Sequence, residues 1–509
     1  MKIRMDWCFP SRCLLALVVL FFAGAGRAQA QQGCTGVSPS TTGSVTWNPQ
    51  WCQEFNGAQG SPDTTVWSFD LGNGGFGNNE LETYCGPPGF AGNPSNCPST
   101  FSTSTSNAYV DGTGHLVIQA INTPNAANSI PPPTFKHKTR VWLSIAMMGF
   151  LVSVVVVPVA RRRSRNLLYV LTLVAGLTLM GAATWSCGGG SGGGAPIIPP
   201  NNGSTWYSAR MKTQGLQNFQ YGRIEASIQL PDTTNQGLWP AFWSLGSDIN
   251  TTPWPACGET DFMEVWSTQV NGGPGPAGNR TTIHTSATDG AGLQPNGAYT
   301  FPSGQANNTS FHTYGTIWSA NMQQFYIDNP QQPYYITTPS NLSPGDTWPF
   351  NAQIFLITNI AVGGTLGGTP SASTPNPAIM MMDYVRQYQA APVTPPAMGT
   401  PPPISVQPGA TTGNATFSPT LAPGTGYAYF SCSTNAPKAS CVISTNDPLN
   451  TYVVSSSASS AESVTATVTT SGTTPGNYSA TVYAFTESNT SDGSNSNADA
   501  SVVIPLTVN

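Results

Sequence analysis

Short apolar stretches separated by turn residues dominate the chain and limit what it can fold into. The sequence holds 53 glycines and 45 prolines, which mark turns and end helices. Charged residues make up only 8% of the chain, so it lacks the Ala, Glu, Lys and Leu content of helical bundles and coiled coils. Aromatic residues reach 10%, which is not the composition of a disordered chain. The pattern predicts an all-β protein built from sandwiches.

The predicted strands fall into two blocks, residues 45–120 and residues 204–390. The clearest are VWSFDLG, AYVDG and HLVIQAI in the first block, and RIEASIQL, TDFMEVW, FHTYGTIWS, QFYID and IFLITNIAV in the second. Their short length and even spacing favour one β-sandwich made from both blocks. Residues 121–203 differ in composition and therefore form an insert that interrupts this domain.

Two uncharged runs of bilayer-spanning length lie in the insert, at residues 141–160 and 167–185. Four arginines between positions 161 and 165 separate them, and a Gly-rich tether follows. Because basic residues stay on the cytoplasmic side of a membrane, the runs predict a two-helix transmembrane hairpin with both flanks outside. A buried core hairpin, a lipoprotein signal ending at Cys187 and an insertion without a role are the alternatives.

The first 30 residues have the pattern of a signal peptide. A basic start precedes the apolar run LLALVVLFFAGAG, and Ala28-Gln29-Ala30 fits a cleavage site. Residues 31–44 then form a linker to the first block. We expect an exported protein, extracellular or periplasmic, which residues 141–185 anchor to the membrane.

The C-terminal part differs in composition from the two blocks. Residues 391–403 form a Pro-rich linker, which favours an extended, semi-rigid chain. Residues 404–509 are rich in Ser, Thr, Ala and Val, and GNYSATVYAF and SVVIPLTVN predict paired strands. This region resembles the small immunoglobulin-like β-sandwiches of secreted bacterial proteins. Its few aromatic side chains favour a spacer over a glycan-binding module; they are Tyr427, Tyr429, Phe430 and Tyr483.

Charge excludes one class of partner. Of 17 Lys and Arg residues, 11 lie before residue 31 or between residues 136 and 165. The rest of the chain contains only six basic residues but 21 of the 22 acidic residues. So acidic a surface offers no basic patch that could bind nucleic-acid phosphates. A neutral polymer such as a glycan fits better, and we expect a monomer.

Cysteine spacing points to structural disulfides and not to a zinc site. Cys432 and Cys441 are close in sequence and are expected to pair. Two further bridges are expected among four cysteines, but the sequence leaves their connectivity open; these are Cys34, Cys52, Cys85 and Cys97. Cys257 is expected to be a buried thiol.

Three acidic residues stand close together in the segment WPACGETDFMEV. Glu259 and Asp261 share one face of a strand, because side chains alternate faces. Glu264 would point to the other face unless a β-bulge near residues 262–263 adds one residue. Three carboxylates without a basic partner repel one another, which is costly in a structural role. Glycoside hydrolysis uses such a set, since one carboxylate attacks and one carboxylic acid donates a proton. A metal site is the alternative, but the surrounding tryptophans favour sugar.

Around this strand the sequence resembles glycoside hydrolase family 16, in particular its laminarinase-like members. The supporting motifs are, in order, NNELETY, YSARMKT, YGRIEASIQLP, GLWPAFWSLG, WPACGETDFMEV, FHTYGTIWS, NIAVGG and MDYVRQYQ. The resemblance implies a β-jelly roll whose concave sheet forms a glycan cleft, and hydrolysis with retention. It implies Glu259 as the nucleophile, Asp261 as the residue that orients it and Glu264 as the acid/base. The bulged ExDxxE spacing resembles laminarinases, agarases and carrageenases, and not lichenases or xyloglucan enzymes.

The resemblance also implies substrate contacts. Tryptophan rings can stack on sugar rings, and polar side chains can bind sugar hydroxyls. The corresponding residues are Trp239, Trp243, Trp254, His284, Asn79, Glu80 and Arg210. Core packing is the alternative for each tryptophan, and a structural or solvated role is the alternative for the polar residues. Thr260 stands where the family usually has Ile and is expected to point away from the cleft.

Catalysis by this family needs no cofactor, but many members hold a structural Ca²⁺ on the convex side. The matching positions are Glu54, the backbone carbonyl of Gly114, and Asp383. Oxygen ligands suit Ca²⁺, so these three residues form the expected metal site.

The expected function is a retaining, endo-acting hydrolase of β-1,3-glucan such as laminarin, with mixed β-1,3/1,4-glucan as a further substrate. A galactan hydrolase of the agarase or carrageenase kind is one alternative, although a sulfated galactan would favour a basic cleft. A transglycosylase shares the same covalent intermediate. A non-catalytic glycan-binding protein is the last alternative, and it would typically have lost one of the carboxylates that this chain retains.

Overall fold

The computed structural model describes residues 33–42, 45–124, 204–285, 295–458 and 460–509. The predicted signal peptide and the predicted transmembrane runs at 141–160 and 167–185 lie outside these residues. Within the described ranges, no helix is long and apolar enough to cross a membrane.

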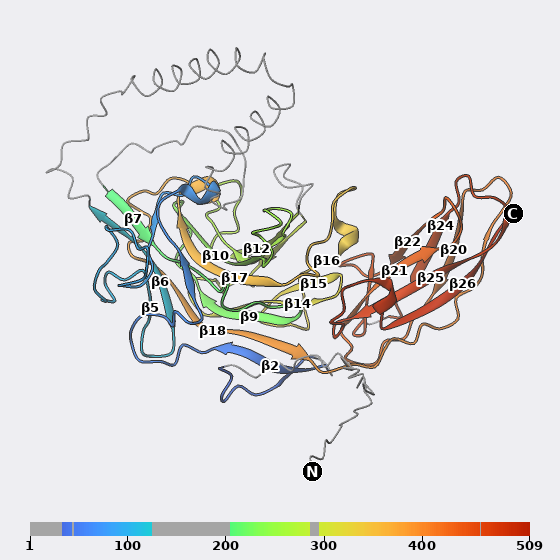
Figure 1. The fold of residues 1–509 in the computed structure, drawn as a ribbon, viewed down its shortest axis with the longest axis horizontal. Helices are drawn as coiled ribbons and strands as arrows, with labels where there is room; N and C mark the ends of the chain where they lie inside the picture. The colour runs from blue at the N-terminus through green and yellow to red at the C-terminus, as the bar shows by residue number, and fades with distance from the viewer. Residues whose placement is uncertain (1–32, 43–44, 125–203, 286–294, 459) are drawn as a thin grey trace, which may run out of the picture.

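Two β-sheets from both predicted blocks face each other as a sandwich (Figure 1). The main path of the eleven-stranded sheet is β16 (Tyr335–Thr337), β15 (Met322–Ile327), β14 (His312–Ser319), β9 (Gly222–Gln229), β18 (Ala378–Ala390), β6 (Leu116–Pro124), β7 (Ser204–Ser208) and β4 (Thr83–Tyr84). Its remaining strands are β1 (Ser40–Thr42) and β2 (Val45–Gln53), which pair with each other, and β5 (Ala108–Val110), which pairs with β6.

The seven-stranded sheet carries the residues of interest for function. Its order is β13 (Asn296–Thr300), β12 (Gly278–His284), β11 (Glu259–Glu264), β10 (Leu238–Gly246), β17 (Ile354–Val362), β8 (Arg210–Lys212) and β3 (Ser68–Asp70). Helices are short in the described residues: η1 (Gly75–Gly77), η2 (Pro339–Asn341), α3 (Gly364–Gly367) and η3 (Asn495–Asn497).

One hydrophobic core fills the space between the two sheets. Ile224 and Leu116 of the larger sheet and Phe242 and Leu356 of the smaller sheet are each 0% exposed and belong to the same cluster. Burying a side chain of this size contributes about 1.5–3 kcal/mol. Because this core fixes the inner face of β11, the other face of that strand is left for function.

The motif YSARMKT is divided between two strands. Strand β7 ends at Ser208 and pairs with β6 in the larger sheet. Strand β8 begins at Arg210 and pairs with β17 in the smaller sheet. The chain changes sheets at Ala209, which is 0% exposed. A small side chain suits this crossing, because both sheets approach the backbone there.

The ends of the insert meet in the fold. Strand β6 runs to Pro124 and pairs antiparallel with β7, with Pro124 opposite Ser204. The insert therefore leaves the sandwich and returns to it between two adjacent strands.

Replacing residues 125–203 with a four-residue Gly/Asn loop should preserve the sandwich. Loops of this length join paired antiparallel strands, and each halving of loop length removes about 0.6 kcal/mol of closure entropy. The unfolding temperature of the shortened protein, followed by circular dichroism, should equal or exceed that of the parent. Loss of the β-sheet signal would contradict this expectation.

Residues 404–509 form a second, smaller sandwich around its own core. Its five-stranded sheet has the order β19 (Ile404–Val406), β26 (Ala500–Val508), β25 (Gly476–Thr486), β21 (Tyr427–Thr434) and β23 (Val453–Ser455). Its three-stranded sheet has the order β20 (Thr412–Phe417), β24 (Val464–Thr469) and β22 (Ser440–Thr445). The predicted pairing of GNYSATVYAF with SVVIPLTVN is confirmed by β25 and β26. The immunoglobulin-like assignment stays a prediction.

Three disulfides link nearby positions. Cys432 pairs with Cys441 as predicted. The connectivity that the sequence left open is Cys34 with Cys52 and Cys85 with Cys97. Cys257 is buried, as expected.

The small sandwich is docked on the large one, beside β15 and β16 (Figure 1). Tyr429, Val453 and Phe485 face outward from the five-stranded sheet and belong to the core cluster of the large sandwich. Met398 of the linker is 7% exposed and belongs to the core of the small sandwich. One face of the module is therefore buried against the large sandwich, and its role as a spacer stays a prediction.

A buried carboxyl lies in this interface. Glu487 is 4% exposed, and its Oε1 accepts hydrogen bonds from Gln324 Nε2 at 2.8 Å and from the Tyr427 backbone N–H at 3.0 Å. Burial raises the pKa of Glu487 to about 7, although both hydrogen bonds oppose the shift. The folded state therefore holds a proton on this group that the unfolded chain releases near pH 4.5.

The variant Glu487→Gln should remove one pH dependence of stability. For a carboxyl with a raised pKa, the stability contribution is fully present below the unfolded pKa and is lost as pH rises through the folded pKa. Between pH 5 and 8 the parent should lose on the order of 2–3 kcal/mol relative to Glu487→Gln. Thermal unfolding at several pH values measures this difference.

The matched control is Asp232→Asn, which changes an exposed acid on the large sandwich. A parent and a Glu487→Gln variant that keep parallel stability profiles from pH 5 to 8 would contradict the assignment.

Candidate active site

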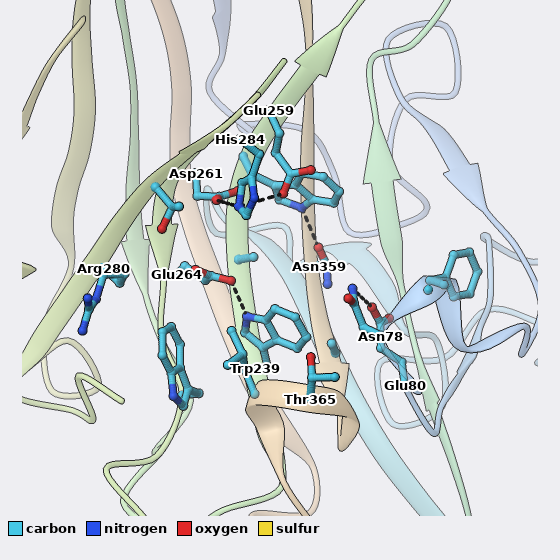
Figure 2. A pocket seen from close by; sticks show the side chains of 18 of the residues that line it. Asn78, Glu80, Trp239, Glu259, Asp261, Glu264, Arg280, His284, Asn359 and Thr365 are labelled. Atoms are coloured by element: carbon cyan, nitrogen blue, oxygen red, sulfur yellow. Dashed lines mark hydrogen bonds and ion pairs between the residues drawn. The ribbon is translucent and has the colours of Figure 1, made fainter. Parts of the chain in front are cut away.

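A β-bulge in β11 brings three carboxylates to one face of the small sheet. On the β12 side, Glu259 lies opposite His284, Asp261 opposite Thr282 and Glu264 opposite Arg280, with the irregularity between Asp261 and Glu264. On the β10 side, the register skips Phe262. The bulge expected near residues 262–263 is therefore confirmed, and all three carboxylates line one cleft (Figure 2).

The intervening side chains of β11 point into the core. Thr260, Phe262 and Met263 are at most 2% exposed. Thr260 Oγ1 lies 3.3 Å from the side-chain amide of Gln323 on β15. As expected from the alternation of faces, Thr260 does not reach the cleft, and its hydroxyl has a polar partner in the opposite sheet.

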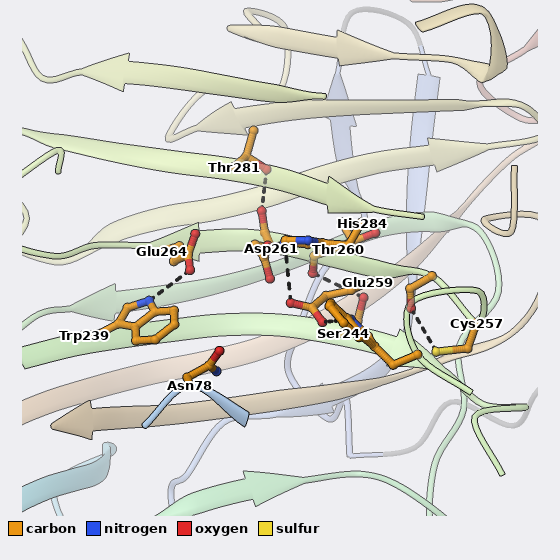
Figure 3. Close-up of polar contacts among 12 residues, drawn as sticks. Asn78, Trp239, Ser244, Cys257, Glu259, Thr260, Asp261, Glu264, Thr281 and His284 are labelled. Atoms are coloured by element: carbon orange, nitrogen blue, oxygen red, sulfur yellow. Dashed lines mark hydrogen bonds and ion pairs between the residues drawn. The ribbon is translucent and has the colours of Figure 1, made fainter. Parts of the chain in front are cut away.

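Two tryptophans donate hydrogen bonds to the two glutamates. Trp254 Nε1 donates to Glu259 Oε2 at 2.6 Å. Trp239 Nε1 donates to Glu264 Oε1 at 2.9 Å (Figure 3). An indole N–H is a donor only. One oxygen of each glutamate is therefore held by a neutral group that adds no charge to the site.

His284 lies beside Asp261 and Glu259 in the row of carboxylates. Its Nε2 lies 3.2 Å from Asp261 Oδ2 and 3.7 Å from Glu259 Oε1 (Figure 2). Thr281 Oγ1 donates to the Asp261 backbone carbonyl. These distances place His284 nearest to Asp261 and Glu259.

The environment keeps protons on this cluster. Burial is the main cause that raises the pKa of Glu259 to about 8; His284 lowers it, and Asp261 raises it. Burial also raises the pKa of Glu264 to about 8, helped by the negative charge of Asp261 and opposed by His284. The hydrogen bonds from Trp254 and Trp239 lower the two values. Such coupled groups titrate as a set, so the set supplies both a carboxylic acid and a carboxylate near neutral pH.

The cleft has a volume of about 590 Å³. All ten predicted catalytic and substrate-contacting residues line it. Trp239, Trp243 and Trp254 are half-buried, and each has one ring edge hydrogen-bonded to a cleft side chain. For Trp243 the acceptor is Asn359 Oδ1, at 2.9 Å. The cleft position of all three tryptophans leaves them available for stacking against sugar rings.

Arg210 and Glu80 are held by internal contacts. Arg210 is 4% exposed, pairs with Asp70 at 2.9 Å and stacks over Trp243 at 4.7 Å. Glu80 Oε2 accepts from Tyr84 at 2.8 Å, and its Oε1 accepts from Asn78 at 3.2 Å. Both residues support the cleft wall, so their expected contacts with sugar hydroxyls stay a prediction.

Sequence reasoning missed several residues that line the cleft. These are Phe76, Asn78, Trp266, Arg280, Thr282, Asn296, Asn359 and Thr365. Arg280 had a detectable signal, since it lies four residues before His284 on one strand and therefore on the same face. Its position opposite Glu264 depends on strand register, which the sequence pattern does not supply.

Two groups of residues offer possible metal ligands. Among the described residues, Glu259, Asp261 and His284 have ligand atoms within 4.8 Å of one another. At the expected Ca²⁺ position, both oxygens of Glu54 accept hydrogen bonds from Arg386, at 2.8 and 2.7 Å. Both Glu54 oxygens therefore already have an arginine partner. The Ca²⁺ site of Glu54, Gly114 and Asp383 stays a prediction, and no step below depends on it.

A β-sandwich whose cleft carries three carboxylates on one bulged strand, between tryptophans, is a carbohydrate-active domain. Comparison with known proteins specifies its kind. Residues 200–384 match the family described as Glycosyl hydrolases family 16. The chain therefore contains a glycosyl hydrolase family 16 domain.

Similar proteins match part of the chain. The glucan endo-1,3-beta-glucosidase A1 of Niallia circulans is 34% identical over 199 residues, which are 37% of this chain and 27% of that protein. The beta-glucanase of Rhodothermus marinus is 33% identical over 198 residues, which are 37% of this chain and 65% of that protein. A solved endo-beta-1,3-glucanase from Pyrococcus furiosus is 28% identical, with a TM-score of 0.45 over 69% of this chain and 98% of that one. The chain thus spans less than two thirds of the first two relatives.

Proposed function

We propose that this protein is a retaining, endo-acting hydrolase of β-1,3-glucan, with mixed β-1,3/1,4-glucan as a further substrate. The observation that carries the proposal is the row of three carboxylates on β11, with each glutamate hydrogen-bonded by a tryptophan of the same cleft. The names of the similar proteins, glucan endo-1,3-beta-glucosidase and beta-glucanase, support the choice of glucan.

In the proposed first step, a Glu259 oxygen attacks the anomeric carbon. The glycosidic C–O bond breaks, and Glu264 gives its proton to the departing sugar oxygen. In the second step, Glu264 takes a proton from water, and the water oxygen attacks the same carbon and releases Glu259. Asp261, between the two glutamates on the same face, orients Glu259 and keeps the pKa of Glu264 high through its charge.

The remaining expectations belong to the same proposal. The protein acts outside the cytoplasm as a monomer and is attached to the membrane through residues 141–185. Hydrolysis of a galactan, transglycosylation and glycan binding without cleavage are the competing outcomes of the test below.

The parent should release short oligosaccharides from laminarin, and Glu259→Gln should lower the rate by about 10³-fold or more, because it removes the nucleophile. Chromatography follows the products, and proton NMR of the first turnover should show the β-anomer. Matched assays use agarose, carrageenan and barley β-glucan.

Cleavage of a galactan instead of laminarin would reassign the substrate. Longer products at high oligosaccharide concentration would indicate transglycosylation. Binding without cleavage by a folded parent would overturn the enzymatic assignment.

The two tryptophan–glutamate hydrogen bonds should control opposite limbs of the pH profile. Trp254→Phe removes a donor that lowers the pKa of Glu259, so the acidic limb of kcat/KM should move up by about one pH unit. Trp239→Phe should move the basic limb up by a similar amount, because it raises the pKa of Glu264. Initial rates from pH 4 to 10 measure both limbs.

Trp266→Phe is the matched control. Trp266 also lines the cleft, but its indole N–H donates to the Val270 backbone carbonyl at 2.8 Å and not to a carboxylate. An equal shift of either limb in this control would contradict the role given to the hydrogen bonds.

A further inference from the structure

The segment between residues 339 and 351 links β16 to β17 and lies against the start of the catalytic strand. Pro349 and Phe350 pack over Gly258, the residue before Glu259. A Cβ at Gly258 would lie 2.7 Å from Pro349 Cγ and 3.1 Å from Phe350 Cε1. Glu259 is the first residue of β11, so the packing on Gly258 fixes the point at which the catalytic strand begins.

The same segment also contacts the neighbouring strand. Asp346 Oδ2 accepts a hydrogen bond from Thr285 Oγ1, and Thr285 directly follows His284. The segment thus contacts the residue before Glu259 and the residue after His284. Glu259 and His284 lie opposite each other in the sheet. Glu259 and His284 therefore each stand next to a residue that this segment contacts.

The small sandwich holds the first end of the segment. Asn450 Nδ2 donates to Asn341 Oδ1 at 2.6 Å and lies 3.3 Å from the Ile336 backbone carbonyl. Asn450 is 5% exposed, and its own Oδ1 accepts the Tyr452 backbone N–H at 2.9 Å. One buried amide therefore joins the two sandwiches at the start of the segment.

The small sandwich also holds the last end. Asn351 Nδ2 donates to the Asp492 carbonyl at 3.1 Å, and Asn321 Nδ2 donates to the Gly493 carbonyl at 2.7 Å. Gly493 has a φ of +76°, and a Cβ there would lie 2.2 Å from Asn351 Nδ2. Only glycine allows this approach, so the contact requires this residue.

We propose that the small sandwich is a positioning module of the active site, which clamps the segment 339–351 at both ends and thereby holds Glu259 and His284 in place. The inference rests on the proposed function for its catalytic consequence. It differs from a spacer and from a glycan-binding module, because Tyr429 and Phe485 are buried against the large sandwich and are not available to a sugar.

The physical basis is the sensitivity of catalysis to small displacements. A shift of about 1 Å in a reacting group can lower the rate about 10²-fold. The segment is anchored by the small sandwich through hydrogen bonds at residues 341 and 351, with no disulfide between the described residues of the two sandwiches. Weakening these bonds should therefore loosen the nucleophile without removing any group from the cleft.

The test uses the full chain with Asn450→Asp and, separately, Gly493→Ala. Asn450→Asp keeps the acceptor for Tyr452 but replaces the donor to Asn341 with a carboxylate oxygen. The control is Asn446→Asp, the same change at an exposed position four residues earlier. The measurements are kcat and KM on laminarin and on a short soluble oligosaccharide, the pH profile, and hydrogen exchange of residues 254–262.

Both interface variants should lower kcat about 10–100-fold while KM changes less than twofold, and the control should match the parent. The acidic limb should move to higher pH, because a displaced Glu259 receives a weaker hydrogen bond from Trp254, and this bond then lowers its pKa less. Exchange of residues 254–262 should become faster. An increase in KM on the polymer alone would indicate a glycan-binding module and overturn the proposal.

Unchanged exchange at 254–262, together with faster exchange at the interface residues 427–429, would also overturn it. This readout needs no substrate, so it separates failure of the clamp from failure of the proposed hydrolase function. If the parent cleaves no glycan but the exchange changes as expected, the clamp stands and the reaction must be reassigned.

Discussion

The β-bulge in β11 is the local constraint on which the site depends. A regular strand would turn Glu264 into the hydrophobic core, where an unpaired carboxylate costs several kcal/mol. The additional residue, Phe262, instead occupies the core with Met263. The bulge thus serves both faces of one strand: it completes the packing between the sheets and aligns the third carboxylate with the other two.

The carboxylates remain close together because neutral donors hold them. Arg210, the nearby buried cation, is paired with Asp70 and stacked on Trp243. The glutamates instead receive indole N–H groups from Trp239 and Trp254. A direct ion pair would lower the pKa of the acid that must donate a proton. Indole donors fix the geometry and leave the pKa values of Glu259 and Glu264 high.

The sequence was informative where one residue pattern admits one geometry. The spacing of Glu259, Asp261 and Glu264 requires a bulge if all three share a face, and the bulge lies where that argument placed it. The change of sheet at Ala209 could not be inferred, because the motif YSARMKT has the pattern of one continuous strand. The position of Arg280 opposite Glu264 depends on register across two strands. Local pattern contains no information on register when the connecting loops are long.

The five-stranded sheet of the C-terminal sandwich shows why a domain role is harder to infer than a fold. Along β21, Ala428 and Phe430 fill the core of the small sandwich, while Tyr429 points to the large one. A sheet with one solvated face would alternate apolar and polar residues. Aromatic residues on the outer face indicate a second buried surface, but they do not identify what covers it. Only the three-dimensional contacts of Asn450 and Gly493 show that the covering surface includes the segment behind Glu259. The module and the segment behind the catalytic strand are therefore parts of one packed unit, although the residues in contact lie 109 to 172 positions apart in the sequence.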